Sequence, residues 1–302
     1  MKYETYTEYD PRAVAQTHPA FLTVWSALGG YHDDLVLLGG LVPQYICKHP
    51  AGRAALPRPA TLDVDLGVSL GATMGQYGTL STDLRAQGFR LSEKQRGRFE
   101  KECGGFTLHV DFLVEDGGSP RGTRIVDDAP ASVMPGVVRA LATARQISIA
   151  GTDLFGARQK VMARVCDAGA FIVLKLRAFL HRQQGKDVFD LLYTMLHYDG
   201  GTQAAVKSFA REARAGNPAF ADARIALETL FADEASPAAI KAAHFVFGPP
   251  RAVETDDANL RRMQVRQDTR LAGQRLLQAI QSGGATKTRQ TATPSLPKFL
   301  QS

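Results

Sequence analysis

Cysteines are scarce in this 302-residue chain, and it has no long apolar run. Cys47, Cys103 and Cys166 are odd in number and far apart, which excludes a disulfide framework and a zinc knuckle. No apolar run approaches the roughly 18 residues that span a bilayer, so no membrane partner is expected. The first residues are polar and acidic and lack the apolar core of a signal peptide. We therefore predict a cytoplasmic protein with reduced thiols.

Two common catalytic motifs are also absent. No Lys-Ser or Lys-Thr pair follows Gly39-Gly40, so these glycines do not form a Walker A loop. The serine and histidine residues have no spacing that indicates a hydrolase triad. The composition is close to the globular average, with 44% apolar and 22% charged residues, which excludes a wholly disordered chain. The length predicts about two domains.

The formal net charge of +6 is concentrated near the C-terminus. Residues 1–150 hold 15 Lys and Arg against 16 Asp and Glu, and residues 151–250 hold 12 against 10. Residues 251–302 hold 9 against 4. This basic C-terminal segment favours an anionic partner but does not identify it.

Apolar periodicity predicts alternating helices and strands up to about residue 168 and helices beyond it. In the first part, helices are expected at 12–29, 41–49 and 76–87, and strands at 35–38, 62–70, 89–94, 97–102, 106–115, 146–151 and 157–165. In the second part, helices are expected at 170–183, 186–198, 203–245 and 257–281, with a Gly-Pro-Pro breaker at 248–250.

These elements predict an α/β (α+β) chain in three parts. Residues 1–168 form a domain on a mixed sheet, whose edge is closed by a hairpin within 146–165. Residues 169–250 form a helical domain. Residues 251–302 form a basic helix followed, from 283, by a low-complexity and disordered tail.

Two carboxylates, Asp63 and Asp65, lie on one face of the strand expected at 62–70. Positions i and i+2 of a strand point the same way, and two such charges repel unless a cation lies between them. Asp111, on the strand at 106–115, completes a three-carboxylate cluster if the two strands pair. Oxygen ligands of this kind suit Mg²⁺ or Mn²⁺. The alternative is a solvated strand face; His109, beside Asp111, is either a ligand or a structural histidine.

Gly39-Gly40 ends the first predicted strand and begins a helix. Without Cβ atoms the backbone can approach a phosphate closely, and a helix N-terminus offers free N–H groups. The alternative is an ordinary turn.

A run of charged residues crosses the first two helices of the second part. Lys175, Ala178 and Arg182 fall on one helical face, and Lys186, Asp187 and Asp190 follow. Lys175 interrupts an otherwise apolar run, which is unusual for a solvated lysine. The alternatives are a snorkelling Lys175 and an exposed face of salt bridges.

The order of these three motifs resembles the nucleotidyltransferase superfamily related to polymerase β. The stretch LKLRAFLHRQQGKDVFDLL is similar to the Lys…Ala…Arg…Lys-Asp…Asp-Leu signature of its AbiEii-type branch, which contains bacterial nucleotidyltransferase toxins. The resemblance covers roughly residues 30–200. It implies a mixed-sheet nucleotidyltransferase domain at 1–168, and a helical domain at 169–250 that carries the Lys/Asp motif.

The resemblance implies roles for the first two motifs. Asp63, Asp65 and Asp111 match the metal-binding acids, with Asp111 holding the metal that activates the acceptor hydroxyl or acting as its base. Gly39 and Gly40 match the turn that contacts phosphates.

It also implies roles for the charged helical run. Lys175 matches a catalytic lysine that contacts the nucleotide phosphates, and Arg182 and Lys186 match nucleotide-binding positions. Lys186, Asp187 and Asp190 match a later polar cluster, in which Asp187 is the better candidate for a catalytic role. The 22 residues between Gly40 and Asp63 exceed the compact spacing of the superfamily, and the segment 49–60 resembles an insertion that leaves the roles of Arg58 and Thr61 open.

The implied activity is an Mg²⁺- or Mn²⁺-dependent nucleotidyltransferase that moves a nucleoside monophosphate from an NTP to a macromolecule, an RNA such as tRNA or a protein. The resemblance further implies the toxin of a toxin–antitoxin or phage-defence system, with a cognate antitoxin as partner. One alternative is a catalytically inactive nucleotidyltransferase-fold module that binds nucleotides or another protein. Another is a nucleic-acid-binding protein that acts through residues 251–302.

Overall fold

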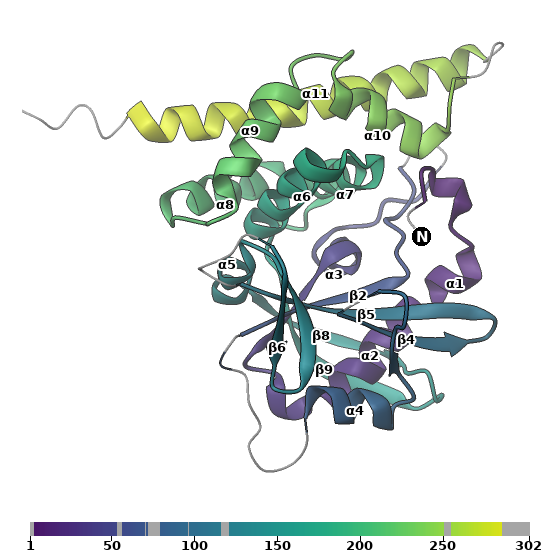
Figure 1. Ribbon diagram of the computed structural model, residues 1–302. Helices are drawn as coiled ribbons and strands as arrows, with labels where there is room; N and C mark the ends of the chain where they lie inside the picture. The colour runs from purple at the N-terminus through teal and green to yellow at the C-terminus, as the bar shows by residue number, and fades with distance from the viewer. Residues whose placement is uncertain are drawn as a thin grey trace, which may run out of the picture.

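In the described residues, a mixed sheet with short helices around it lies below a stack of C-terminal helices (Figure 1). The coarse prediction of an α+β chain with a mixed sheet is therefore confirmed. The structure is a computed structural model, and it describes residues 3–52, 56–69, 71, 79–95, 97–115, 121–250 and 255–285.

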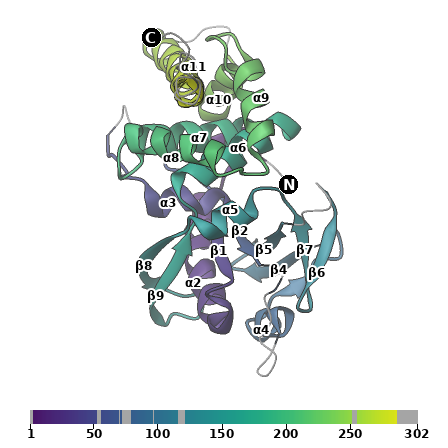
Figure 2. The ribbon, with the colours of Figure 1, turned by 90° about the vertical axis from the view of Figure 1, so that its left-hand side faces the viewer.

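The described residues form a sheet of nine strands. They are β1 (Leu35–Leu38), β2 (Asp63–Val68), β3 (Arg90–Leu91), β4 (Arg98–Cys103), β5 (Phe106–Val114), β6 (Thr123–Val126), β7 (Ala129–Val133), β8 (Arg145–Thr152) and β9 (Arg158–Val165). The order is β3-β4-β5-β2-β1-β9-β8, and the β6–β7 hairpin joins β5 through β7 (Figure 2). The pairs β2–β5, β5–β7 and β1–β9 are parallel, and the others are antiparallel.

Short helices surround the sheet, and longer ones form the second layer. The α-helices are α1 (Pro11–Ala15), α2 (Thr17–Ala27), α3 (Val42–Ile46), α4 (Leu80–Ala86), α5 (Val137–Ala142), α6 (Ala168–Arg182), α7 (Gly185–His197), α8 (Thr202–Arg214), α9 (Phe220–Leu230), α10 (Pro237–Phe247) and α11 (Asp256–Ala285). Short 3₁₀ helices are η1 (Tyr6–Glu8), η2 (Gly29–Tyr31) and η3 (Gly39–Leu41). No helix in the described part of the chain combines the length and apolarity needed to cross a bilayer.

Strand β2 places the acidic pair as its alternation predicts. Val64, Leu66 and Val68 are buried, whereas Asp63 and Asp65 are only partly buried on the other face. Strand β2 pairs with β1 on one side and with β5 on the other, so it lies inside the sheet. The aspartates therefore project from the middle of the sheet and not from an edge.

The prediction of one helix over 12–29 is wrong. The segment forms α1 and α2, separated at Gln16, and then η2. Pro19 provides the reason, because it has no N–H to donate to the Ala15 carbonyl and its ring crowds that oxygen.

Sequence patterns also missed the β6–β7 hairpin and α5, although α5 packs against β1, β2 and β5. Most other predicted elements are present with shifted ends. The predicted helix 41–49 is shorter, because α3 ends at Ile46 and Cys47 pairs with Tyr198 in an isolated bridge. The predicted helix 76–87 starts at Leu80, and residues 72–78 lie outside the described residues.

The predicted sheet-edge hairpin and the C-terminal helices are confirmed. Strand β8 pairs with β9 and ends the sheet order, and the region 203–245 divides into α8, α9 and α10. Helix α10 ends before Gly248, which has a φ of +72°. Helix α11 ends at Ala285 and so includes the first three residues of the predicted tail, 283–285, and residues 286–302 lie outside the described residues.

The change from sheet to helices falls between Val165 and Ala168, close to the predicted domain boundary. One cluster of buried apolar side chains nevertheless runs through both parts, from Phe21 in α2 to Leu276 in α11. The division into domains at 1–168, 169–250 and 251–302 stays a prediction.

Gly169 offers a test of how α6 packs on α8. A Cβ atom at Gly169 would lie 2.5 Å from the Ser208 carbonyl oxygen, a backbone atom that cannot turn aside. We expect Gly169→Ala to lower the free energy of unfolding by about 1–3 kcal/mol, as overpacking does elsewhere. Gly29→Ala is the control, because nothing lies within 4 Å of its Cβ position. Urea unfolding measures both variants, and equal stabilities would contradict the expected contact.

Candidate active site

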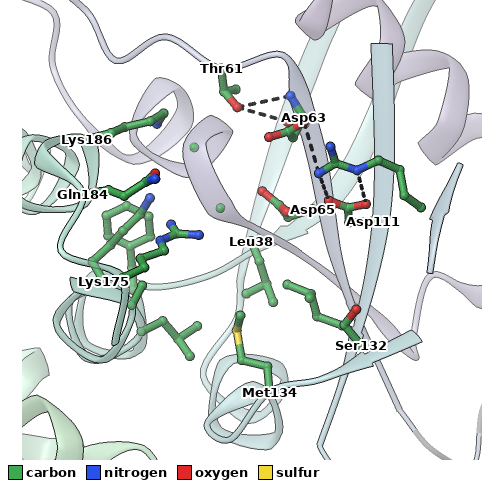
Figure 3. Close-up of a pocket in the computed structure, with 18 of the residues that line it drawn as sticks. Leu38, Thr61, Asp63, Asp65, Asp111, Ser132, Met134, Lys175, Gln184 and Lys186 are labelled. Atoms are coloured by element: carbon green, nitrogen blue, oxygen red, sulfur yellow. Dashed lines mark hydrogen bonds and ion pairs between the residues drawn. The ribbon is translucent and has the colours of Figure 1, made fainter. Parts of the chain in front are cut away.

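A pocket of about 270 Å³ lies between the sheet and helices α6 and α7. Asp63, Asp65 and Asp111 line one side, and Lys175 and Lys186 line the other (Figure 3). The turn after β1 also contributes to the pocket, because Gly39 and Gly40 line it. All three sequence motifs are therefore brought together in one place.

The register of two parallel strands builds the acidic wall. Asp65 in β2 is directly opposite Asp111 in β5, and Asp63 is opposite His109. Burial, followed by the nearby charges of Asp63 and Asp111, raises the pKa of Asp65 to about 7. Asp65 makes no ion pair with any described residue. The acidic wall therefore carries negative charge that protein groups do not fully compensate.

The Gly-Gly turn is required by close packing. Gly39 has a φ of +67°, and a Cβ atom there would overlap the Asp65 carboxylate. A Cβ atom at Gly40 would lie 2.8 Å from Thr61 Cβ and 2.9 Å from Lys186 Nζ. Glycine therefore lets the turn pass between the acidic strand and the lysine.

The cationic wall is held in place by a buried carboxylate. Asp190 Oδ2 accepts hydrogen bonds from Lys175 Nζ and from Lys186 Nζ, both at 2.6 Å. Asp190 itself is fully buried, and the two lysine side chains are 8% and 15% exposed. Charge-assisted bonds of this kind order both lysines at the edge of the pocket. The snorkelling alternative for Lys175 is therefore wrong, because its ammonium is buried and paired.

The catalytic role of Asp187 stays a prediction, and the structure places this residue in a buried charge network. It is fully buried, and Arg182 donates to both of its oxygens at 2.5 Å. Burial opposes ionisation, but Lys175 and Arg182 lower the pKa of Asp187 below its ordinary value. Asp187 does not line the pocket, whereas Arg182 does. In this structure Asp187 is thus a partner that positions Arg182.

Arg98 lies inside the acidic cluster, although no sequence motif pointed to it. Arg98 Nε donates to Asp111 Oδ1 at 2.9 Å, and Nη2 donates to Oδ2 at 2.5 Å. The same Nη2 is 3.5 Å from Asp63 Oδ1. A signal was present: the Gly104-Gly105 turn between β4 and β5 fixes the hairpin register that pairs Arg98 with Asp111.

Several further side chains complete the pocket without a sequence signal: Tyr9, Gln95, Ser132, Met134 and Gln184. Burial, followed by the charges of Asp190 and Asp63, raises the pKa of Tyr9, so its hydroxyl stays protonated at neutral pH. Thr61 also lines the pocket, and its hydroxyl accepts a hydrogen bond from the Asp63 N–H at 3.2 Å. Arg58 does not line it.

His109 lies beside the acidic wall but outside the pocket lining. Its Nδ1 is buried and makes no hydrogen bond within the described residues. Burial, followed by the charge of Arg98, lowers the pKa of His109, which favours the neutral ring. This environment favours the structural role over the ligand role.

The acidic wall fits a divalent cation in part. Carboxylate oxygens are the ligands that Mg²⁺ prefers, and Asp63 and Asp65 point to the same side of β2. Within the described residues, however, no three His, Cys, Asp or Glu side chains are arranged as a metal-binding group. Both oxygens of Asp111 are instead bound to Arg98. The chemistry of the donor set therefore fits the cation at Asp63 and Asp65.

Opposed acidic and basic walls are suited to a ligand that carries phosphates and a metal ion. No family model, curated protein or solved structure matches this chain. The function is therefore inferred from the motifs and from the geometry of the pocket.

The raised pKa of Asp65 predicts pH-dependent stability. Its pKa is about 7 in the folded chain against an ordinary 3.8, so the native state binds the proton more tightly than the unfolded state. Stability from this group is present at low pH and is lost as the pH rises towards 7. In EDTA at pH 8, Asp65→Asn should raise Tm by about 2–4 °C for each kcal/mol of repulsion removed, and by less at pH 5.

The control is Asp33→Asn, which changes an exposed carboxylate and should leave Tm unchanged at both pH values. Thermal unfolding, monitored by circular dichroism, gives the Tm of the native chain and of both variants at pH 5 and at pH 8. A Tm gain for Asp65→Asn that is equal at pH 5 and pH 8 would contradict the prediction.

Proposed function

We propose that this chain is a divalent-cation-dependent nucleotidyltransferase, which transfers a nucleoside monophosphate from an NTP to a macromolecular acceptor. One observation carries the proposal: the acidic pair on β2 faces Lys175 and Lys186 across a pocket of about 270 Å³. A nucleoside triphosphate bound with Mg²⁺ presents both a cation and an anionic chain. The Mg²⁺-bound triphosphate therefore matches both walls, with its cation at the aspartates and its phosphates at the lysines, whereas Mg²⁺ or the triphosphate alone matches only one.

The lysines would act on the triphosphate. Attack by an acceptor hydroxyl forms a bond from its oxygen to the α-phosphorus, the bond from that phosphorus to the bridging oxygen breaks, and pyrophosphate leaves. Negative charge grows on the leaving group, and Lys175 and Lys186 are held by Asp190 at a place where they can neutralise it. The backbone of the Gly39-Gly40 turn is close enough to the pocket to contact a phosphate.

The aspartates would hold the cation and the acceptor. Asp63 and Asp65 are the residues that would bind Mg²⁺ or Mn²⁺, and the ion would supply charge neutralisation at the reacting phosphate. The hydroxyl proton of the acceptor needs a base. Asp111 is the third carboxylate of the wall, and it could receive that proton once its oxygens are released from Arg98.

The proposed acceptor is an RNA such as tRNA, or a protein hydroxyl, and the proposed biological role is a toxin with a cognate antitoxin. The basic C-terminal part supports an anionic acceptor, but less than its charge count suggests. In α11, Arg262 donates to the Gly248 carbonyl and Arg270 pairs with Glu234. These two arginines therefore interact with groups of the same chain, which makes them less available to an anionic acceptor.

The activity is tested by incubating the protein with Mg²⁺, total RNA and NTPs labelled at the α-phosphate. We expect label in RNA or in protein, and none from NTPs labelled at the γ-phosphate. Asp63→Ala should reduce transfer by about a hundredfold or more, the scale seen when a group that stabilises developing charge is lost. Asp33→Ala is the matched control. Absence of label with the native chain, or equal transfer by Asp63→Ala, would contradict the proposal.

The Arg98 contact supports a second candidate, a catalytically inactive module on the same scaffold. An internal guanidinium that neutralises Asp111 and approaches Asp63 is what a chain without a metal would need. Calorimetry with Mg²⁺-NTP separates the candidates. An interaction module binds no nucleotide, and a nucleotide-binding module binds it without transferring label.

A further inference from the structure

Arg98 is held in the acidic wall by the architecture of the sheet. Strand β5 lies between β4 and β2, so Asp111 has Arg98 directly opposite on one side and Asp65 on the other. Cross-strand neighbours of this kind lie within reach of each other's side chains. The sheet therefore brings the guanidinium to the same face as the three carboxylates.

The contact occupies the oxygens that a cation would use. Arg98 donates two hydrogen bonds to Asp111, one to each oxygen, and the same guanidinium approaches Asp63 at 3.5 Å. The Arg98 and Asp111 side chains are only 13% and 15% exposed, so water screens the pair weakly. Asp65 takes no part in it.

The pair adds little to the architecture. Strands β4 and β5 are already joined by a two-glycine turn and by a ladder that runs from Arg98–Asp111 to Cys103–Phe106. By contrast, the ion pair of Arg139 with Glu212 joins α5 to α8, which no hairpin connects. Arg98 also lines the pocket, so its side chain has space to move out of the cluster.

We propose that Arg98 is an internal counter-cation that competes with a divalent cation for Asp63 and that keeps Asp111 from joining the ligands of that cation. The proposal rests on the nucleotidyltransferase function proposed above. A guanidinium is permanently charged and weakly hydrated, so it neutralises the carboxylates in the absence of metal. Mg²⁺ needs oxygen ligands, and the same carboxylate oxygens cannot satisfy both cations fully. Arg98 therefore weakens binding of the free metal ion.

The test measures Mn²⁺ binding to the full chain without nucleotide, by the loss of the electron paramagnetic resonance signal of free Mn²⁺. Arg98→Gln keeps a hydrogen-bonding side chain and removes the charge, and it should bind Mn²⁺ about tenfold tighter or more. Arg98→Lys keeps the positive charge but cannot donate two parallel hydrogen bonds to Asp111, and it should bind Mn²⁺ with an affinity between those of the native chain and Arg98→Gln. Arg90→Gln is the matched control, because Arg90 lies in the neighbouring strand of the same meander, is exposed, and should leave binding unchanged.

Equal or weaker Mn²⁺ binding by Arg98→Gln overturns the proposal, since an arginine that only orients Asp111 would aid the metal. If the native chain labels an acceptor while Arg98→Gln binds no tighter, this inference fails and the proposed function stands. If no variant binds Mn²⁺ and no acceptor is labelled, both fail. If Arg98→Gln does not unfold cooperatively, the Mn²⁺ affinity of Arg98→Lys is compared with that of the native chain. Equal or weaker binding by Arg98→Lys then overturns the proposal.

Discussion

Repulsion among the partly buried cluster of Asp63, Asp65 and Asp111 is the constraint around which this pocket is organised. Asp65 and Asp111 lie directly opposite on parallel strands, and Asp63 acts on Asp65 from the same face of β2. Core residues on the other face, such as Val64 and Phe112, are buried, so the strands cannot slide to separate the charges. The chain meets this repulsion by surrounding the cluster with cations.

The cations come from both layers of the molecule. Arg98 is supplied by the sheet itself, whereas Lys175 and Lys186 come from α6 and α7 and are fixed by Asp190. A pair of such buried contacts contributes more to geometry than to stability, because removing charges from water is costly. The pocket has both walls only because the helices pack against the sheet, since its lining comes from both layers.

Much of the fold follows from periodicity, and the failures have local causes. Alternation identified β2 and β5, and helical spacing identified α6 and α7 together with the face that carries Lys175. The break between α1 and α2 follows from Pro19, a signal that was present in the sequence. Arg98 was also within reach, because the hairpin turn determines which residue faces Asp111. Helix α5 and the β6–β7 hairpin had patterns too short to stand out.

The sequence by itself determined which residues carry charge, which face of each element they occupy, and how neighbouring strands joined by a tight turn align. These properties depend on contacts a few residues apart, so local geometry decides them. Only the tertiary structure decided that β2 and β5 pair in parallel with Asp65 beside Asp111, and that Asp187 lies behind Arg182 and away from the pocket. Those arrangements depend on how distant segments pack around one core, where a shift of a single residue would turn every side chain to the other face.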